Sequence, residues 1–215
     1  MSSKIFKGVL LLSTIYPDKR VKRTVENFKT ALLELMKKKR FQDITITEIV
    51  HAADYNRGTF YAHYKCKEEL LDEIIDDMFE QMEEAYRKPY EDLSVIDFHE
   101  LSANAIVLFD HFLDHKEFYK LMLSPETNYS FQEKMINRLD KLFRAEFEFF
   151  TDDVDADIDI NLFSTYRIHG IIGILMQWIH SDFREEPEYM GKQLIHILRF
   201  STPKVSVKKP DSNHP

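Results

Sequence analysis

Cationic and aromatic side chains alternate along one short stretch of the sequence, TITEIVHAADYNRGTFYAHYKCKEELL, which covers residues 45–71. Arg57, His63 and Lys65 stand there beside Tyr61 and Tyr64. Arginine forms bidentate hydrogen bonds with guanine edges, and lysine and tyrosine side chains donate to phosphate oxygens. The stretch therefore indicates a surface that contacts an anionic partner.

The charge is unevenly distributed along the chain. The 215 residues have a formal net charge of -8, yet residues 1–67 hold 14 Lys and Arg against 6 Asp and Glu. A basic N-terminal third followed by an acidic remainder suggests an anion-binding module attached to an acidic body. With only 5 Gly and 7 Pro and little strand-like alternation, the chain is predicted to be all-α.

Two short helices, with a longer helix before them and another after them, are expected to position the candidate stretch. Amphipathic periodicity predicts a first helix over residues 18–40. Thr45 and Glu48 form a capping box for a second helix that ends near Ala53, and Asn56 is a good N-cap for a third over residues 57–64. Two short helices joined by a turn, with a longer helix before them, predict a helix-turn-helix, whose second helix enters the major groove of DNA.

Within this motif, Arg57 and Thr59 are candidates to read base edges, and Gly58 lets the backbone approach DNA closely. The candidate phosphate contacts are Tyr61, His63, Tyr64, Lys65 and Lys67, and Asn56 is counted among the DNA-binding residues too. Phe60 is expected in the core, and either Tyr61 or Tyr64 can also point inward.

The rest of the chain is predicted to be helical too. A fourth helix is expected from about Lys67 to Tyr86, before Pro89. Further helices are expected over residues 94–115, 116–123, 129–150, 160–183 and 188–200. The predicted organisation is a leader (1–17), a helix-turn-helix domain (18–66), a helical effector-binding and dimerisation domain (67–200) and a disordered tail (201–215).

Residues 18–71 resemble the DNA-binding domain of the TetR family of bacterial transcriptional repressors. The matching positions are Thr45, Ile49, Ala52, Ala53, Gly58, Thr59, Phe60, Tyr61, His63, Lys67, Glu68 and Leu70. The resemblance implies that Thr45, Tyr61, His63 and Lys67 lie at phosphates, with Thr47 as an addition, and that bases are read around residues 57–59. Asp54 and Tyr55 stand where the family usually has glycine and a small aliphatic residue, and Cys66 stands where a Ser or Asn cap is common.

The resemblance also implies a helical body that forms a homodimer through its last two helices. The sequence supports this independently, because the penultimate helix is apolar on more than one face. The candidate interface residues are Gly170, Gly173, Ile174, Trp178, Leu194 and Leu198, with burial inside one monomer as the alternative.

Aromatic, methionine and histidine residues of the body could line a pocket for a hydrophobic or amphipathic effector that releases the operator. The candidate pocket residues are Phe109, Phe112, His115, Tyr119, Met122, Tyr166 and His169. Aromatic residues at helical spacing are, however, more often plain core.

Other functions have little support in the sequence. His111 and His115 have a chelating spacing but no third ligand, so no metal and no cofactor are predicted. No catalytic motif occurs, and an enzyme is not expected. The single cysteine and the absence of a membrane-length apolar segment favour a cytoplasmic protein without a membrane partner. The alternative function is a sensor or interaction protein of the same fold that no longer binds specific DNA.

Overall fold

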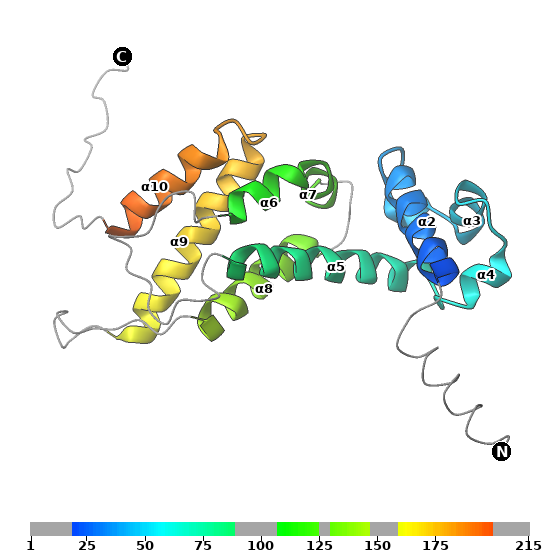
Figure 1. Cartoon of the computed structure of the whole chain (residues 1–215), viewed down its shortest axis with the longest axis horizontal. Helices are drawn as coiled ribbons and strands as arrows, with labels where there is room; N and C mark the ends of the chain where they lie inside the picture. The colour runs from blue at the N-terminus through cyan, green and yellow to red at the C-terminus, as the bar shows by residue number, and fades with distance from the viewer. Residues whose placement is uncertain (1–18, 89–106, 125–129, 147–158, 200–215) are drawn as a thin grey trace, which may run out of the picture. The chain divides into compact units, whose positions relative to one another are not determined.

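The computed structural model describes residues 19–88, 107–124, 130–146 and 159–199. These residues form nine α-helices and one 3₁₀-helix, with no strand among them, and the predicted all-α class is confirmed (Figure 1). The predicted leader and tail lie outside the described residues.

The chain divides into two compact units. The first lies within Met1–Gln81 and Glu117–Glu146, and the second within Met82–Lys116 and Phe147–Pro215. The first unit is therefore built from two separate stretches of sequence, whereas the domain boundary predicted from the sequence fell at residues 66 and 67.

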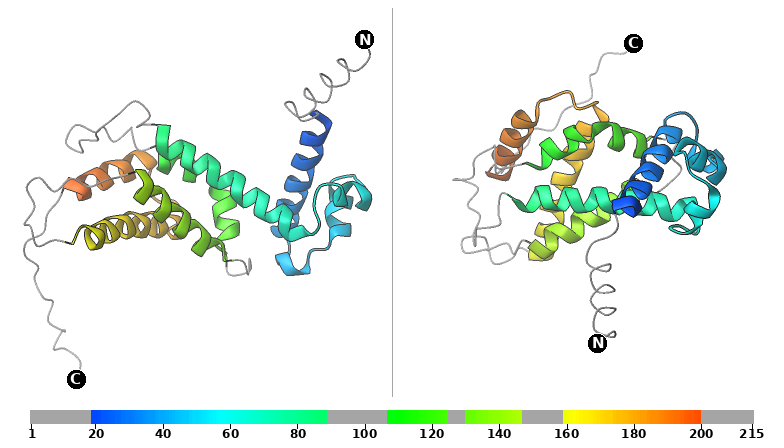
Figure 2. Two further views of the ribbon diagram at one scale, coloured as in Figure 1. Left: turned by 90° about the horizontal axis from the view of Figure 1, so that it is seen from below. Right: turned by 45° about the vertical axis from the view of Figure 1, so that its right-hand side comes forward.

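The first unit begins with the predicted helices of the helix-turn-helix, coloured from blue to cyan in Figures 1 and 2. They are α2 (Lys19–Met36), α3 (Ile46–Ala52), α4 (Arg57–Tyr61) and the start of α5 (Lys67–Arg87), and the structure adds the 3₁₀-helix η1 (Phe41–Asp43), which the sequence did not predict. Helix α2 ends four residues earlier than expected. The chain turns there, so that Phe41 and Ile44 are buried in the core of the unit.

Aromatic rings hold α2, α3 and α4 together. Phe28 of α2 and Phe60 of α4 have no exposed surface, and their ring centroids lie 5.4 Å apart in an edge-on arrangement. The Phe28 ring also lies 5.2 Å from Tyr55, in the turn between α3 and α4. Burial of each phenylalanine side chain contributes about 1.5–3 kcal/mol, so these contacts fix α4 against α2. The expectation that Phe60 is a core residue is confirmed.

Helix α5 attaches to the short helices and to α8 (Phe131–Glu146) through polar and aromatic contacts. The Lys29 ammonium on α2 lies 2.8 Å from a Glu73 oxygen and 2.5 Å from an Asp77 oxygen of α5. On α8, Phe131 stacks on Phe79 of α5 with ring centroids 5.5 Å apart. The short helix α7 (Lys116–Met122) contributes the Tyr119 ring, 6.2 Å from Phe131.

The second unit contains α6 (Leu108–Asp114), α9 (Ile160–His180) and α10 (Pro187–Arg199). Trp178 of α9 is 1% exposed and donates a hydrogen bond from Nε1 to the Glu185 carbonyl at 2.9 Å. Its indole meets Phe109 and Phe183 edge-on, with ring centroids 5.3 and 4.9 Å away. Trp178 therefore lies at the centre of this unit's core. In the part of the chain that the structure describes, no helix is long and apolar enough to cross a membrane.

Candidate nucleic-acid interface

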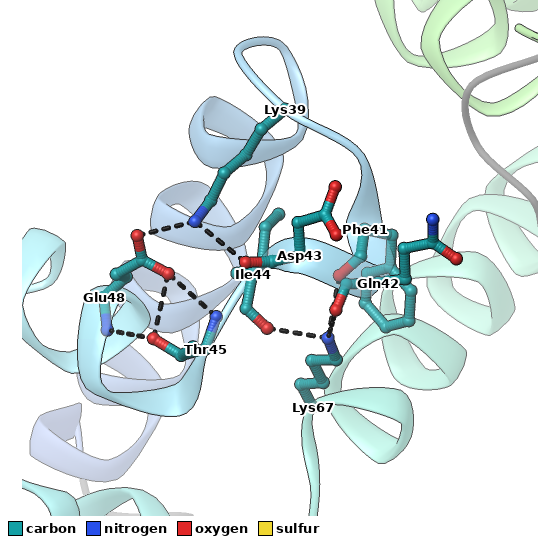
Figure 3. A network of polar contacts seen from close by, with 8 residues as sticks. All are labelled: Lys39, Phe41, Gln42, Asp43, Ile44, Thr45, Glu48 and Lys67. Atoms are coloured by element: carbon teal, nitrogen blue, oxygen red, sulfur yellow. Dashed lines mark hydrogen bonds and ion pairs between the residues drawn. The ribbon is translucent and has the colours of Figure 1, made fainter.

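Helix α3 begins with the capping box that the sequence predicts. The Glu48 amide donates to the Thr45 hydroxyl at 3.3 Å, and the Glu48 carboxylate accepts from the Thr45 amide and hydroxyl, each at 2.9 Å (Figure 3). Lys39 adds a hydrogen bond of 2.6 Å to the other carboxylate oxygen. Lys39, followed by the two Thr45 donors, lowers the pKa of Glu48 to about 2. Charge-assisted hydrogen bonds thus hold the start of α3 in one geometry.

The turn between α3 and α4 forms without the glycine common in the family. Asp54 has a φ of 62°, in the left-handed region that aspartate tolerates better than most residues. The Tyr55 amide donates to the Val50 carbonyl at 2.8 Å, and the Tyr55 hydroxyl accepts from Asn27 of α2 at 3.3 Å. The unusual residues Asp54 and Tyr55 therefore support the turn.

Helix α4 is short and depends on its N-cap. The Asn56 side-chain oxygen accepts from the Thr59 amide at 2.9 Å and lies 3.2 Å from the Thr59 hydroxyl oxygen. A Cβ atom at Gly58 would lie 3.1 Å from the same Asn56 oxygen, tighter than ordinary van der Waals contact. Gly58 thus accommodates the cap, a role additional to the close approach to DNA that the sequence suggests.

The exposed face of α4 carries a cation held by an aromatic side chain. The Arg57 guanidinium donates to the Tyr61 hydroxyl at 3.1 Å and lies 5.8 Å from the centre of its ring. Arg57 is exposed, and Tyr61 is 49% exposed. An arginine presented in this way can hydrogen-bond with a base edge or a phosphate.

Two of the expected DNA contacts have other roles in the structure. Tyr64 is only 4% exposed and packs against Phe60 with ring centroids 5.6 Å apart. Burial and the nearby Glu73 carboxylate raise the pKa of Tyr64. The prediction that Tyr64 donates to phosphate is wrong, because its side chain lies in the core.

The Lys67 ammonium, at the start of α5, donates to three backbone carbonyls, those of Phe41 at 2.8 Å, Gln42 at 3.0 Å and Ile44 at 2.6 Å (Figure 3). A lysine ammonium has three donors, so each is already directed at a protein oxygen. This geometry does not support the predicted phosphate contact of Lys67.

The remaining predicted residues are brought to the surface around α3 and α4. Thr45, Thr47 and Lys65 are exposed, and Thr59 and His63 are half-buried. The Thr45 hydroxyl already donates to Glu48. Lys65 has 91% of its side chain exposed, with Glu69 3.5 Å away. Lys39, which donates to the Glu48 carboxylate of the capping box, was not among the predicted site residues.

The candidate pocket residues fall in both units. Phe109 and Phe112 are buried in the second unit beside half-buried His115, whereas Tyr119 and Met122 are buried in the first unit. Tyr166 is 76% exposed and His169 is exposed, so neither points into the core of its unit. Their assignment to a pocket is wrong for this structure, because they lie on the solvent-facing side of α9.

The candidate dimer residues also separate into two groups. Gly170 and Gly173 are exposed, and a Cβ atom added to either would meet no heavy atom within 4 Å. Ile174 and Leu198 are half-buried. Trp178 and Leu194, at 1% and 6% exposed, are core residues of the second unit. Their assignment to an interface is wrong, because the apolar character of these positions serves the core of the second unit.

The family models give an independent comparison. "Bacterial regulatory proteins, tetR family" matches residues 30–74, which include α3, α4 and the start of α5, and "Transcriptional regulator C-terminal region" matches residues 99–200. The chain is 22% identical over 177 residues to the uncharacterized HTH-type transcriptional regulator YxbF of Bacillus subtilis (strain 168). That match covers 79% of this chain and 43% of the relative, so the chain spans less than half the length of that curated protein.

Solved structures share the fold. A TetR transcriptional regulator from Streptococcus agalactiae 2603V has a TM-score of 0.55 at 21% identity, over 84% of this chain and 96% of its own. A transcriptional regulator of the TerR/AcrR family from Aquifex aeolicus VF5 has a TM-score of 0.54 at 20% identity, over 82% and 98%.

The two family models, over residues 30–74 and 99–200, and the order of the helices define the class as a transcriptional regulator with a helix-turn-helix DNA-binding domain. The chain belongs to the TetR family of bacterial regulatory proteins.

Proposed function

We propose that the protein is a homodimeric, sequence-specific DNA-binding regulator that acts as a repressor and is released from its operator by a small hydrophobic or amphipathic ligand. The observation that carries the DNA-binding part is α4, which holds Arg57 and Tyr61 exposed while Phe60, on the same short helix, is completely buried. A rigidly seated helix with a cationic outer face fits the major groove.

The exposed side of α9 supports the dimer. Leu162 and Tyr166 are 70% and 76% exposed, and His169, Gly170 and Gly173 continue the same face toward the C-terminal end of the helix. Exposed large apolar side chains are typical of an interaction surface. The glycines beside them have no side chain, which allows a second helix to approach closely. A two-fold dimer would place two α4 helices about one DNA turn apart, ~34 Å, as a palindromic operator requires.

Helix α6 supports the ligand. Phe109, Phe112 and His111 are buried, and burial, followed by His115, lowers the pKa of His111 to about 4. His111 is therefore uncharged at neutral pH, and an uncharged imidazole among aromatic rings suits an amphipathic molecule. Ligand binding would favour a conformation in which the two α4 helices no longer match the operator.

DNA binding is tested by fluorescence anisotropy of the full chain with DNA from upstream of its own gene and with random DNA of equal length. We expect tighter binding to the upstream DNA, and weaker binding when sodium dodecanoate is added as an amphipathic probe. Equal affinity for the two DNAs at low salt would refute the proposal of a specific regulator.

The dimer is tested by sedimentation of the wild type, of Tyr166→Arg and of Gln132→Arg, a matched control on the exposed surface of α8. The wild type and the control should sediment as dimers. Tyr166→Arg should shift toward the monomer, because a charge would be buried against the partner. A wild type that sediments as a monomer at micromolar concentration would contradict the dimer.

A further inference from the structure

Two lysine ammonium groups donate hydrogen bonds to the backbone carbonyls of the segment that joins α2 to α3. Lys67 donates to the carbonyls of Phe41, Gln42 and Ile44, and Lys39 donates to the carbonyl of Asp43 at 2.9 Å. The four consecutive carbonyl oxygens of residues 41–44 thus all accept from lysine. Figure 3 shows Lys39 and Lys67 approaching the segment from different sides. Hydrogen bonds to a charged donor are stronger than neutral ones, so this short segment is firmly held.

Lys67 and Lys65 differ sharply although they are two residues apart. The Lys67 ammonium lies 4.7 Å from the centre of the Phe41 ring, in addition to its three carbonyl contacts. A phosphate could reach it only by displacing one of these carbonyls. Lys65, with 91% of its side chain exposed, can turn toward a phosphate without breaking any contact of that kind.

The segment held by Lys67 leads directly into α3. Ile44 is 2% exposed and anchors the segment in the core, and the next residue, Thr45, is the N-cap of the helix. Thr47, in the first turn of α3, is exposed, and its hydroxyl makes no hydrogen bond with the described residues. The position of Thr47 therefore depends on the segment that Lys67 and Lys39 hold.

We propose that Lys67 is a positioning residue, which fixes residues 41–45 so that the first turn of α3 presents Thr47 to the DNA backbone, and that Lys67 does not itself bind phosphate. This inference rests on the proposed DNA-binding function. It predicts that loss of the Lys67 ammonium weakens DNA binding without changing the number of phosphates that the protein contacts.

The first test compares the full-length wild type with Lys67→Met and Lys65→Met. Methionine keeps an apolar stem against the Phe41 ring and removes the donors. Binding to the upstream DNA is measured at several salt concentrations, below the melting temperature of each protein. Each phosphate contact contributes about 0.9 to the slope of log affinity against log salt.

We expect Lys67→Met to bind roughly tenfold more weakly with the wild-type slope, because several hydrogen bonds to a charged donor are lost. Lys65→Met should lower the slope if Lys65 contacts phosphate, and it calibrates the assay. A slope lowered by about 0.9 in Lys67→Met would overturn the inference. Wild-type affinity in that variant would overturn it as well.

A double-mutant cycle with Thr47→Ala separates positioning from a general loss of stability. If Lys67 acts through Thr47, the effect of Lys67→Met should shrink to less than about threefold in the Thr47→Ala protein. A tenfold effect in both backgrounds would contradict action through Thr47.

A third measurement needs no variant, so it remains decisive if Lys67→Met fails to fold. Lysine ammonium signals of the ¹⁵N-labelled wild type are recorded by NMR with and without DNA. We expect the Lys67 signal to keep its shift on DNA binding. A hydrogen-bond scalar coupling between Lys67 Nζ and a DNA phosphorus would overturn the inference while leaving DNA binding intact. A wild type that binds no DNA would overturn the proposed function and the inference together.

Discussion

Replacement of Asn56 separates the stability of the recognition helix from its contact with DNA. The Asn56 oxygen accepts from the Thr59 amide at 2.9 Å at the start of a helix of only five residues. Loss of an N-cap typically costs about 1 kcal/mol. Asn56→Ala should therefore lower the free energy of unfolding by about that amount, whereas Asn56→Asp should leave it nearly unchanged, because aspartate caps as well as asparagine.

The variant Asn56→Asp, which should keep nearly the wild-type stability, should nevertheless lose affinity for DNA. Asn56→Asp places a carboxylate at the exposed start of α4, beside the expected phosphates. Like charges about 4 Å apart repel by about 1 kcal/mol in water and by more where water is excluded, so its affinity should fall about tenfold. Asn137→Asp, on the exposed surface of α8, adds the same charge elsewhere and should leave affinity unchanged.

The assays are urea denaturation followed by circular dichroism, and fluorescence anisotropy with the upstream DNA at low salt. Wild-type affinity in Asn56→Asp would refute the view that this end of α4 faces DNA. Wild-type stability in Asn56→Ala would show that the observed cap contributes nothing to folding.

Three further predictions concern the two units. The lowered pKa of Glu48 stabilises the folded state above its ordinary pKa of 4.5, and this contribution is lost as the pH falls toward about 2. The difference in unfolding free energy between wild type and Glu48→Gln should therefore be largest near pH 7 and should shrink below about pH 4 in urea titrations; a constant difference would contradict this. Burial lowers the pKa of Lys29, but its bonds to Asp77 and Glu73 outweigh that effect and raise it. Its contribution should be complete below about pH 10 and lost at higher pH, and Lys29→Met should cost about 1–2 kcal/mol at pH 7, measured by the same titration; an unchanged midpoint would count against it. Trp178→Ala should lower the free energy of unfolding by about 3–5 kcal/mol, measured by thermal or urea unfolding. If this variant instead kept the wild-type stability and only dissociated from dimer to monomer, Trp178 would be an interface residue rather than a core residue.

The sequence could predict elements that depend on local signals. The caps at Thr45 and Asn56 were predictable because each accepts from a backbone amide three residues away, and the structure has both. The order of the helices followed from the spacing of apolar residues. The core position of Phe60 was predictable for the same reason.

The sequence could not reveal contacts between residues far apart along the chain. Lys67 and Phe41 are separated by 26 positions, and a lysine near a recognition helix has the same letter whether it meets a phosphate or a carbonyl. Tyr166 and Trp178 are both aromatic residues of α9, yet one is 76% exposed and the other 1%. Periodicity shows that such a helix has several apolar faces but not which of them the rest of the chain covers.

The first unit is built from two stretches of sequence, and this limits how the helix-turn-helix domain can be produced as a separate fragment. A fragment that stops at Gln81 would contain α2, α3 and α4, but the aromatic surface of Phe79 would lose its stacking partner Phe131. Such a truncated peptide would expose apolar surface to water and tend to aggregate. A minimal DNA-binding fragment would therefore have to join the segment that ends at Gln81 to the segment that begins at Glu117.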